Sequence, residues 1–537
     1  AIIGAGPGGY SAALKLAQLG KKTVLIENHK LGGECLNYGC IPSKTIISAS
    51  NLFDKISNFN EQGIECDNLS INLPRFQSWK DSIIKKLNKG IEILCKNYNV
   101  TIIFGTAKIK TKNVIQVKSN NQITEISTDN IIIATGSQPK ELQNLQFDQE
   151  LIVSSKEMLE IKTIPRNILV VGGGAIGLEL GTAFAKIGSK VTIVEITDSL
   201  LPGIDKDLVN VVKKSLNNLN VDVFFHSKIL HVEKYPTKIK ITIESNKNKI
   251  EKTFDKILIS IGRIPSTKNL GLETIGINTD NNGFVEVDKN MMCNIPGIYA
   301  IGDITGPPWL AHKASTQGVK VAHFISKSKE VSQNNNIPYA VFTEPEIATI
   351  GISEEEALRK NIKIKVGKFQ FAANARALTS KNTDGFVKVV TDQNSNKILG
   401  VHIVGSDASN LIGEASLALT MNVKIEDIEN PNNVKVIVDQ ADFALYFSRA
   451  AIPFRRDRDV DVTYFKHKGI YAFRKQVVLD FEKLPMRMLE ASEKIEAIRY
   501  LEYGKRIKMV LSHSPAIGID TPQDLEEARA ILEKQQS

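Results

Sequence analysis

The same glycine-rich pattern occurs twice in this sequence, each time between an apolar strand and a helix. The glycines stand in G-x-G-x-x-G spacing at Gly4, Gly6 and Gly9 and again at Gly172, Gly174 and Gly177. In such a loop the first glycine permits a tight turn, the second lets a pyrophosphate approach the backbone, and the third lets the helix pack closely on the strand. The helix N-terminus then faces the phosphates with free N–H groups. The repeat therefore predicts two dinucleotide-binding units.

An acidic residue ends the second strand of each unit, Glu27 in the first and Glu195 in the second. An acid at this position accepts hydrogen bonds from ribose hydroxyls. It also repels the 2′-phosphate of NADP, which usually calls for an arginine. Glu195 therefore predicts NAD in the second unit. Two dinucleotides are what hydride transfer between NAD and a flavin requires, so we expect FAD and NAD as cofactors.

Two cysteines, Cys35 and Cys40, directly follow the first unit in a segment bracketed by glycine and proline. A zinc site would require a second pair at similar spacing, and the other three cysteines stand alone at Cys66, Cys95 and Cys293. An odd and low count does not resemble a secreted disulfide framework. The spacing and setting of the pair suit a redox disulfide laid against a flavin.

Composition narrows the possible partners. The formal charge is +9, from 68 basic and 59 acidic residues, but the lysines are scattered, so we expect a solvated surface and no nucleic-acid partner. No run of about 18 apolar residues predicts a membrane span. The chain opens inside an apolar strand pattern without a recognisable signal peptide, so we expect a cytoplasmic protein whose start lies upstream.

The wording Cys-Leu-Asn-x-Gly-Cys-Ile-Pro-Ser-Lys over 35–44 resembles the pyridine nucleotide-disulfide oxidoreductases, and most closely the dihydrolipoamide dehydrogenases. The resemblance covers residues 1–428. It implies that Cys35 exchanges with substrate and that Cys40 faces the flavin. It also implies that Lys44 pairs with Glu179 beside the flavin.

The same resemblance implies further cofactor contacts. Crossover segments between domains match 134–136 and 260–263, Asp303 holds the ribityl chain, and a flavin-side helix starts at Ala311. Residues assigned to the cofactors in this way are Gly136, Gly262, Arg263, Gly302, Asp303 and Ala311. Gln317 stands where the family usually has glutamate.

The expected fold class is α/β, with two Rossmann-type domains, an α+β dimerisation domain and a partial α/β nucleotidyltransferase domain. The FAD domain is expected at 1–140 and 260–325, the NAD domain at 141–259, and a truncated dimerisation domain at 335–428. Family members form homodimers that complete each active site with partner residues. Their substrate is dihydrolipoamide, carried on the lipoyl domain of a 2-oxoacid dehydrogenase complex or of the glycine cleavage system.

The resemblance stops after residue 428. The family continues with a His-Pro-His-Pro-Thr-x-Ser-Glu segment, whose second histidine and glutamate form the base that deprotonates the dithiol substrate. This chain reads Glu-Asn-Pro-Asn-Asn-Val-Lys-Val over 429–436, and none of its eight histidines stands in that motif. We therefore expect an FAD-dependent, NAD-linked oxidation of dihydrolipoamide to lipoamide that is impaired.

Residues 430–537 resemble the C-terminal half of the 3-deoxy-manno-octulosonate (Kdo) cytidylyltransferases. This resemblance implies a sugar pocket with Ser448, Arg449 and His467, and magnesium binding by Asp520. Asp520 precedes a helix start at 521–524, and an ordinary turn residue is an equal alternative. The phosphate-binding loop that begins that family's domain is not in the sequence.

Several alternatives stay open. The C-terminal region predicts CMP-Kdo synthetase activity, or the whole is an inactive chimera of two truncated enzymes. The two resemblances meet at 428–430 without a linker. This favours a chimera from a gene deletion or an assembly error, and sequencing source DNA across codons 420–440 distinguishes these origins.

Other members of the disulfide oxidoreductase class are also alternatives. Glutathione reductases usually prefer NADPH, and mercuric reductases carry a terminal cysteine pair that this chain lacks after Cys293. A non-catalytic binding protein would not need the cysteine pair.

Overall fold

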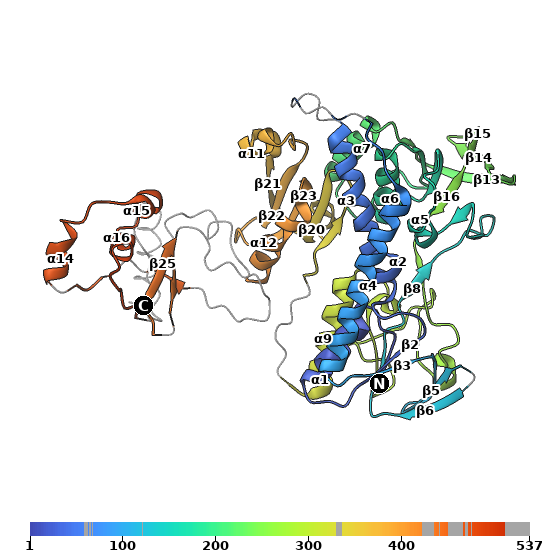
Figure 1. Cartoon of the computed structure of the whole chain (residues 1–537), viewed down its shortest axis with the longest axis horizontal. Helices are drawn as coiled ribbons and strands as arrows, with labels where there is room; N and C mark the ends of the chain where they lie inside the picture. Colours follow the sequence, from blue (N-terminus) through green and yellow to red (C-terminus); the bar gives the residue numbers. More distant parts are fainter. Residues whose placement is uncertain are drawn as a thin grey trace. The chain divides into compact units, whose positions relative to one another are not determined.

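The structure, a computed structural model, describes residues 1–57, 63, 66, 68–120, 122–328, 336–421, 434–439, 441–448, 465–467, 471–473 and 475–510 (Figure 1). The chain divides into two compact units. The larger unit comprises Ala1–Gln393 and Ile398–Asn422, and the smaller comprises Asn394–Lys397 and Val423–Ser537. No helix within the described residues is long and apolar enough to cross a membrane.

The first glycine loop belongs to a five-stranded parallel sheet in the order β18–β7–β1–β2–β3. Its strands are β1 (Ile2–Ile3), β2 (Val24–Glu27), β3 (Thr101–Phe104), β7 (Ile131–Ile133) and β18 (Ile298–Ala300). Helices α1 (Pro7–Gln18) and α9 (Ala311–Ser326) cover one face, where Ile2 is buried. A three-stranded antiparallel sheet covers the other face, where Ile3 is buried. Coverage of both faces explains why the central strands β1 and β7 are apolar throughout.

The second glycine loop repeats this arrangement in a parallel sheet of order β12–β11–β10–β16–β9. Its strands are β9 (Ile152–Val153), β10 (Asn167–Val171), β11 (Lys190–Val194), β12 (Asp222–Phe224) and β16 (Lys256–Ile259). Helices α5 (Ser155–Leu159), α6 (Ala175–Lys186) and α7 (Lys206–Asn218) bury their apolar residues on one face. The strand–loop–helix–strand units predicted around both glycine loops are therefore confirmed.

Small antiparallel sheets complete these two regions. The strands of the first are β4 (Thr106–Thr111), β5 (Val114–Ser119) and β6 (Gln122–Ser127), and those of the second are β13 (Ser227–Lys234), β14 (Ile239–Ser245) and β15 (Asn248–Phe254). A further pair, β8 (Ser137–Pro139) and β17 (Arg263–Pro265), is antiparallel. The two crossover segments expected from the sequence thus lead into paired strands.

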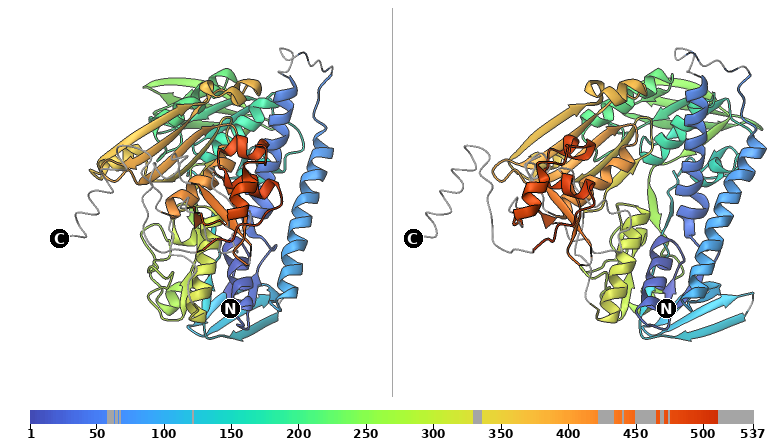
Figure 2. Two further views of the ribbon diagram at one scale, coloured as in Figure 1. Left: turned by 90° about the vertical axis from the view of Figure 1, so that its left-hand side faces the viewer. Right: turned by 60° about the vertical axis from the view of Figure 1, so that its left-hand side comes forward.

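Three helices carry the cysteine segment and its support. They are α2 (Gly33–Tyr38), α3 (Cys40–Ser57) and α4 (Leu73–Asn97). The long helices α3 and α4 lie side by side (Figures 1 and 2). Asn72 caps α4 by accepting a hydrogen bond from the Arg75 backbone N–H at 3.0 Å, as expected for an asparagine N-cap. Helix α3 also packs on α6, so the cysteine helix contacts the second dinucleotide unit.

The last part of the larger unit is an antiparallel sheet in the order β19–β20–β23–β22–β21. Its strands are β19 (Tyr339–Val341), β20 (Glu346–Gly351), β21 (Ile364–Gln370), β22 (Phe386–Asp392) and β23 (Ile398–Gly405). Short helices α8 (Leu272–Ile275), α10 (Glu354–Arg359) and α11 (Ala375–Thr379), the longer α12 (Ala408–Thr420), and the 3₁₀ turns η2 (Gly302–Thr305) and η3 (Phe371–Ala373) complete the larger unit.

The smaller unit has a three-stranded antiparallel sheet in the order β25–β24–β26 among its described residues. Its elements are β24 (Lys435–Val438), β25 (Ala444–Ser448), β26 (Phe465–Lys466), α14 (Lys475–Phe481), α15 (Met488–Glu493) and α16 (Ala497–Glu502). Val436, Phe447 and Ile498 form its buried core. Arg499 binds the buried Glu490 through two nitrogens, each 2.5 Å from a carboxylate oxygen.

A buried lysine ties the antiparallel sheet of the larger unit to the second dinucleotide unit. Lys388 on β22 is completely buried, and its Nζ lies 2.6 Å from Asp205, 2.9 Å from Asp207 and 3.4 Å from Glu354. Asp205 also accepts hydrogen bonds from the backbone N–H groups of Glu354 and Glu355. Burial opposes ionisation of Asp205, but the hydrogen bonds from Lys388 and these N–H groups hold its pKa below the usual value.

Replacing Lys388 with methionine should destabilise the protein by about 3–5 kcal/mol, because it leaves the buried Asp205 carboxylate without its cation. Urea unfolding at pH 7 measures this, and the exposed pair Lys360–Glu356 supplies the control: Lys360→Met should cost at most about 1 kcal/mol. Because the folded-state pKa of Asp205 is depressed, the contribution is present above about pH 4 and is lost as the pH falls further. Equal unfolding midpoints for the two variants would contradict the assignment.

Candidate active site

The paired cysteines lie on two successive helices, the first of which rests against the first glycine loop. Cys35 lies within α2, and Cys40 is the first residue of α3. Gly33 has a φ of +60°, and a side chain there would place its Cβ 2.6 Å from the Cα of Gly6. Only glycine permits this conformation and this close approach. The cysteine segment is therefore packed directly on the loop that the sequence assigns to a pyrophosphate.

The two thiols differ in acidity. Both are free and half-buried. The Cys35 S–H group donates a hydrogen bond to the Cys40 sulfur, which raises the pKa of Cys35 and lowers the pKa of Cys40. Burial raises the pKa of Cys35 further, whereas the Lys44 ammonium adds to the lowering at Cys40. Cys40 also stands at a helix N-terminus, where the helix dipole favours a thiolate. Cys40 is thus the first of the pair to ionise.

Lys44 and Glu179, which sequence reasoning paired, lie 2.7 Å apart between Nζ and Oε2. Lys44 follows Cys40 by four residues on α3, so the two share one face of the helix. Glu179 is buried on α6, the helix that begins at the second glycine loop. Its other carboxylate oxygen accepts a hydrogen bond from the Phe342 backbone N–H at 3.0 Å. Sequence reasoning missed Phe342, because no local spacing connects it with either residue.

The glycines of both loops meet the demands that their spacing predicted. Gly4 and Gly172 have φ values of +100° and +102°, so each needs the left-handed freedom of glycine. A Cβ at Gly9 would lie 1.9 Å from the Gly4 carbonyl oxygen, and a Cβ at Gly177 would lie 2.3 Å from that of Gly172. The first and third glycines therefore serve the turn and the helix packing, and they do so without any ligand.

The second glycine of each loop leaves the following helix without a side-chain cap. Side chains cap the first turn of four other helices, namely Asn72 on α4, Ser154 on α5, Ser353 on α10 and Asn374 on α11. Gly6 and Gly174 provide no such cap to α1 and α6. A Cβ at Gly174 would meet no atom within 4 Å. Uncapped N–H groups beside open space suit the phosphates of a dinucleotide, so both loops fit such a cofactor.

The two strand-ending acids bind their own glycine loops in the same way. Glu27 accepts hydrogen bonds from the backbone N–H groups of Ala5 at 2.7 Å and His29 at 2.8 Å. Glu195 accepts one from Gly173 at 2.7 Å and one from Thr197 at 2.9 Å. Both carboxylates are buried. Each acid therefore holds the loop in shape, a role that the sequence reasoning did not foresee beside the predicted ribose contact.

Two of the remaining predicted cofactor residues, Arg263 and Asp303, belong to one series of hydrogen-bonded side chains. Ser137 donates to Asp303 at 2.6 Å, and Arg263 donates to Ser137 at 2.6 Å and to Glu34 at 2.5 Å. Glu34 directly precedes Cys35, and sequence reasoning did not single it out. These hydrogen bonds thus join the strands β8 and β17 and the η2 turn to α2, the helix that carries Cys35.

Nearby glycines and the flavin-side helix fit the same region. Gly136, Gly262 and Gly302 all have positive φ values, of +73°, +116° and +77°. Ala311 is the first residue of α9. Gln317, which stands where the family usually has glutamate, accepts a hydrogen bond from the Gly302 backbone N–H at 2.8 Å. The amide oxygen of Gln317 therefore accepts this hydrogen bond, as a carboxylate oxygen at the same position could.

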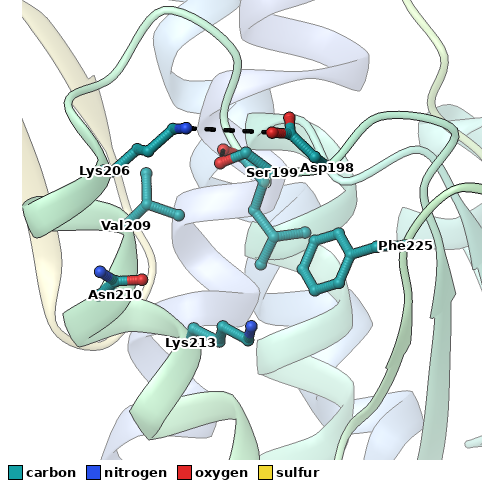
Figure 3. Close-up of a pocket in the computed structure, with 8 residues that line it drawn as sticks. Asp198, Ser199, Lys206, Val209, Asn210, Lys213 and Phe225 are labelled. Carbon is teal, nitrogen blue, oxygen red and sulfur yellow. Dashed lines mark hydrogen bonds and ion pairs between the residues drawn. The ribbon is translucent and has the colours of Figure 1, made fainter. Parts of the chain in front are cut away.

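A small pocket lies between the segment after Glu195 and α7 (Figure 3). Its volume is about 130 Å³. Leu200 and Phe225 contribute apolar surface, and Lys213 Nζ lies 4.8 Å from the centre of the Phe225 ring. An ion pair between Lys206 and Asp198, 4.0 Å apart, lies at its edge. None of the predicted site residues lines this pocket.

The structure describes only part of the site that the sequence predicts for the smaller unit. Ser448 is buried and donates a hydrogen bond to Glu493 at 2.8 Å. The His467 ring lies edge-on to Phe447 with centroids 5.0 Å apart, and burial lowers the pKa of His467. Arg449 and Asp520 lie outside the described residues. No group of three histidine, cysteine or acidic side chains that could hold a metal occurs in the described part of the chain.

Comparison with protein families decides the assignment of the larger unit. The family described as pyridine nucleotide-disulphide oxidoreductase matches residues 1–318, and the dimerisation domain of the same family matches residues 337–433. The chain belongs to this family. Membership implies FAD and a nicotinamide dinucleotide as cofactors. A cytidylyltransferase family model matches residues 414–507.

Individual relatives agree with the family. Dihydrolipoyl dehydrogenase of Geobacillus stearothermophilus is 39% identical over 449 residues, which cover 83% of this chain and 95% of that protein. The Bacillus subtilis enzyme of the same name is 40% identical over 80% of this chain and 91% of its own length. Among solved structures, LpdA of Mycobacterium tuberculosis has a TM-score of 0.74 at 26% identity, covering 79% of this chain and 94% of its own. The flavoprotein disulfide reductase RclA of Escherichia coli has a TM-score of 0.69 at 26% identity, covering 79% and 93%.

Alanine at two glycines of the second loop should have different effects in this oxidoreductase. Gly177→Ala should destabilise the protein by about 1–3 kcal/mol, because its Cβ would lie 2.3 Å from the Gly172 carbonyl oxygen. Gly174→Ala should cost at most about 1 kcal/mol, the penalty of alanine at an N-cap. It should weaken NADH binding by about tenfold, because its methyl group would occupy the open space where a pyrophosphate is expected to approach. Thermal unfolding and NADH titration measure the two effects. Equal unfolding temperatures for both variants would refute the distinction.

Proposed function

We propose that the chain is an FAD-dependent, NAD-linked disulfide oxidoreductase that acts on dihydrolipoamide. The observation that carries the proposal is the arrangement of Cys35, Cys40 and the Lys44–Glu179 ion pair between the two glycine-loop units. The relatives named dihydrolipoyl dehydrogenase support the substrate. In this proposal residues 1–140 and 260–325 form the FAD domain, 141–259 the NAD domain and 335–428 the dimerisation domain of a homodimer.

The proposed reaction converts dihydrolipoamide and NAD⁺ to lipoamide, NADH and a proton. A substrate thiolate attacks the Cys35 sulfur of the Cys35–Cys40 disulfide, and the Cys40 thiolate leaves. The second substrate thiol then displaces Cys35, so lipoamide carries the new S–S bond and the enzyme carries two thiols. Re-formation of the Cys35–Cys40 disulfide from these thiols would release an electron pair and two protons. A flavin bound beside Cys40 would accept the pair, and NAD⁺ bound at the second glycine loop would receive it as hydride, so that one proton is released. Cys40, whose pKa is lowered by the Cys35 hydrogen bond and by Lys44, is suited to be the leaving thiolate beside the flavin.

Glu195 supports NAD over NADP in this proposal. Its carboxylate is buried at the end of β11 and already accepts hydrogen bonds from Gly173 and Thr197. A 2′-phosphate brought to this carboxylate would be repelled. The corresponding Glu27 makes the same kind of contacts in the first loop, where the proposal places FAD. Gly136, Arg263, Asp303 and Ala311 are the proposed further contacts to FAD.

The substrate half of the reaction should be slow. The His-Glu base of the family has no counterpart in the sequence at 429–436, and residues 429–433 lie outside the described part of the chain. Positioned general bases contribute about 10²–10⁴-fold to proton-transfer steps. Cys35, Cys40, Lys44 and Glu179, by contrast, are all present. We therefore expect the reduction of the flavin by NADH to be faster than the oxidation of dihydrolipoamide.

Two steady-state assays on the purified full chain test this function. NADH oxidation with an artificial electron acceptor should proceed, whereas dihydrolipoamide oxidation with NAD⁺ should be about 10²–10⁴-fold slower than in a family member with the base. The matched variant Cys35→Ser should abolish dihydrolipoamide turnover and preserve acceptor reduction. A flavin-containing protein that NADH cannot reduce would contradict the proposal. Dihydrolipoamide turnover at the rate of an intact family member would contradict the role assigned to the missing base.

The cytidylyltransferase match over 414–507 favours a second candidate, transfer of CMP to Kdo. By resemblance Ser448, Arg449 and His467 would contact the sugar, and Asp520 would bind Mg²⁺. We expect no such activity, because the phosphate-binding loop of that family has no counterpart in the sequence. Release of pyrophosphate from CTP in the presence of Kdo and Mg²⁺ measures it. Turnover that disappears in Asp520→Asn would overturn this expectation.

A further inference from the structure

Phe342 contacts both members of the ion pair beside the cysteines. Its backbone N–H donates to Glu179 Oε1 at 3.0 Å, while Lys44 Nζ binds the other carboxylate oxygen at 2.7 Å. The Lys44 ammonium also lies 4.4 Å from the centre of the Phe342 ring. A cation at this distance from a ring is attracted to its π-face. Backbone and side chain of one residue therefore hold the two charges together.

The segment that carries Phe342 is itself firmly held. It follows β19 and leads into β20, and these strands pair in an antiparallel hairpin. The next residues are anchored by Thr343, which donates to the Pro345 carbonyl at 2.8 Å, and by Glu344, which binds the buried Lys186 at 2.8 Å. The Ser215 hydroxyl donates to the Glu344 carbonyl at 2.5 Å. The ring thus presents a fixed surface to Lys44.

The position of the Lys44 side chain depends on such a contact more than the position of Glu179 does. Glu179 is buried and has a hydrogen bond on each oxygen, so both carboxylate oxygens are held in place. The Lys44 side chain is 33% exposed and has four rotatable bonds, and its ammonium interacts with solvent as readily as with a carboxylate. Phe342 packs against the apolar core that also contains Ile46 and Ile47 of α3. The ring therefore occupies volume that the ammonium would otherwise explore.

We propose that Phe342 is a positioning residue, which holds the Lys44 ammonium against Glu179 and within reach of Cys40. The inference rests on the proposed function, because it assigns the dimerisation region a direct part in the redox site. In this role Phe342 acts on Cys40 through Lys44.

The charged groups around Cys40 determine how its pKa should change when the Phe342 ring is removed. Cys40 is faced by Cys35 from α2, by Lys44 from its own helix and by Glu179 from α6. Lys44 favours the Cys40 thiolate, and Glu179 opposes it. When the ammonium is free to leave its position, Glu179 keeps its place and the thiolate loses its nearest cation. The pKa of Cys40 should then rise.

The test measures the pH dependence of Cys40 alkylation by iodoacetamide in the reduced full-length protein, with the modified residue identified by mass spectrometry. Phe342→Leu should raise the alkylation midpoint by about 0.5 pH unit, which is about threefold less thiolate at a given pH. Phe342→Tyr, which keeps a π-face, should leave it unchanged. Phe342→Met repeats the test without the ring should the leucine variant fold poorly, and thermal unfolding monitors both.

Lys44→Met supplies the decisive control. The midpoint should rise in Lys44→Met, and adding Phe342→Leu to that variant should produce no further change, because the two residues act through one ammonium. An unchanged midpoint in Phe342→Leu, or an equal shift with and without Lys44, would overturn the inference. Alkylation needs neither NADH nor dihydrolipoamide, so failure of the proposed redox function and failure of this positioning role give different results.

Discussion

The ion pair between Lys44 and Glu179 joins the parts of the larger unit that a disulfide oxidoreductase must bring together. Lys44 lies one turn after Cys40 on α3, which directly follows the helix packed on the first glycine loop, and Glu179 lies on the helix that begins at the second loop. The backbone of Phe342 fastens the same carboxylate to the antiparallel sheet. Because Glu179 is buried, its charge needs these partners. One carboxylate thus couples two dinucleotide units and the dimerisation region around the cysteines.

The features predicted from the sequence are those that depend on local spacing. The glycine loops and the cysteine pair are encoded within about ten residues each, and backbone geometry leaves little choice at Gly4, Gly9 or Gly33. Phe342, Glu34 and the buried Lys388 escaped prediction because their partners lie far along the chain. Lys44 and Glu179 are equally distant in sequence, and only resemblance to a family paired them. The loop-holding role of Glu27 and Glu195 escaped prediction for another reason, since a carboxylate at a strand end has several possible partners.

The C-terminal region sets the limits of the proposed activity. The dimerisation match ends at residue 433 and the cytidylyltransferase match begins at residue 414, so the two overlap where the resemblance of the chain changes from one family to the other. The smaller unit has its own buried core and the Arg499–Glu490 pair. Chemically, the change falls where the family carries its His-Glu base. The cysteine pair and both glycine loops lie in the region that matches the oxidoreductase family. The sequence changes to the other family at the place where the His-Glu base is expected.

The visible absorption spectrum of the purified protein before and after anaerobic NADH tests the central claim most directly. The account predicts a flavin spectrum that changes to a long-wavelength thiolate–flavin charge-transfer band, because Cys40 is the acidic thiol beside Lys44 and NADH has access through the second loop. Loss of the band in Cys40→Ser would assign it to that thiolate. A protein that binds FAD and shows no spectral change with NADH would contradict the account, as would a protein that binds no flavin.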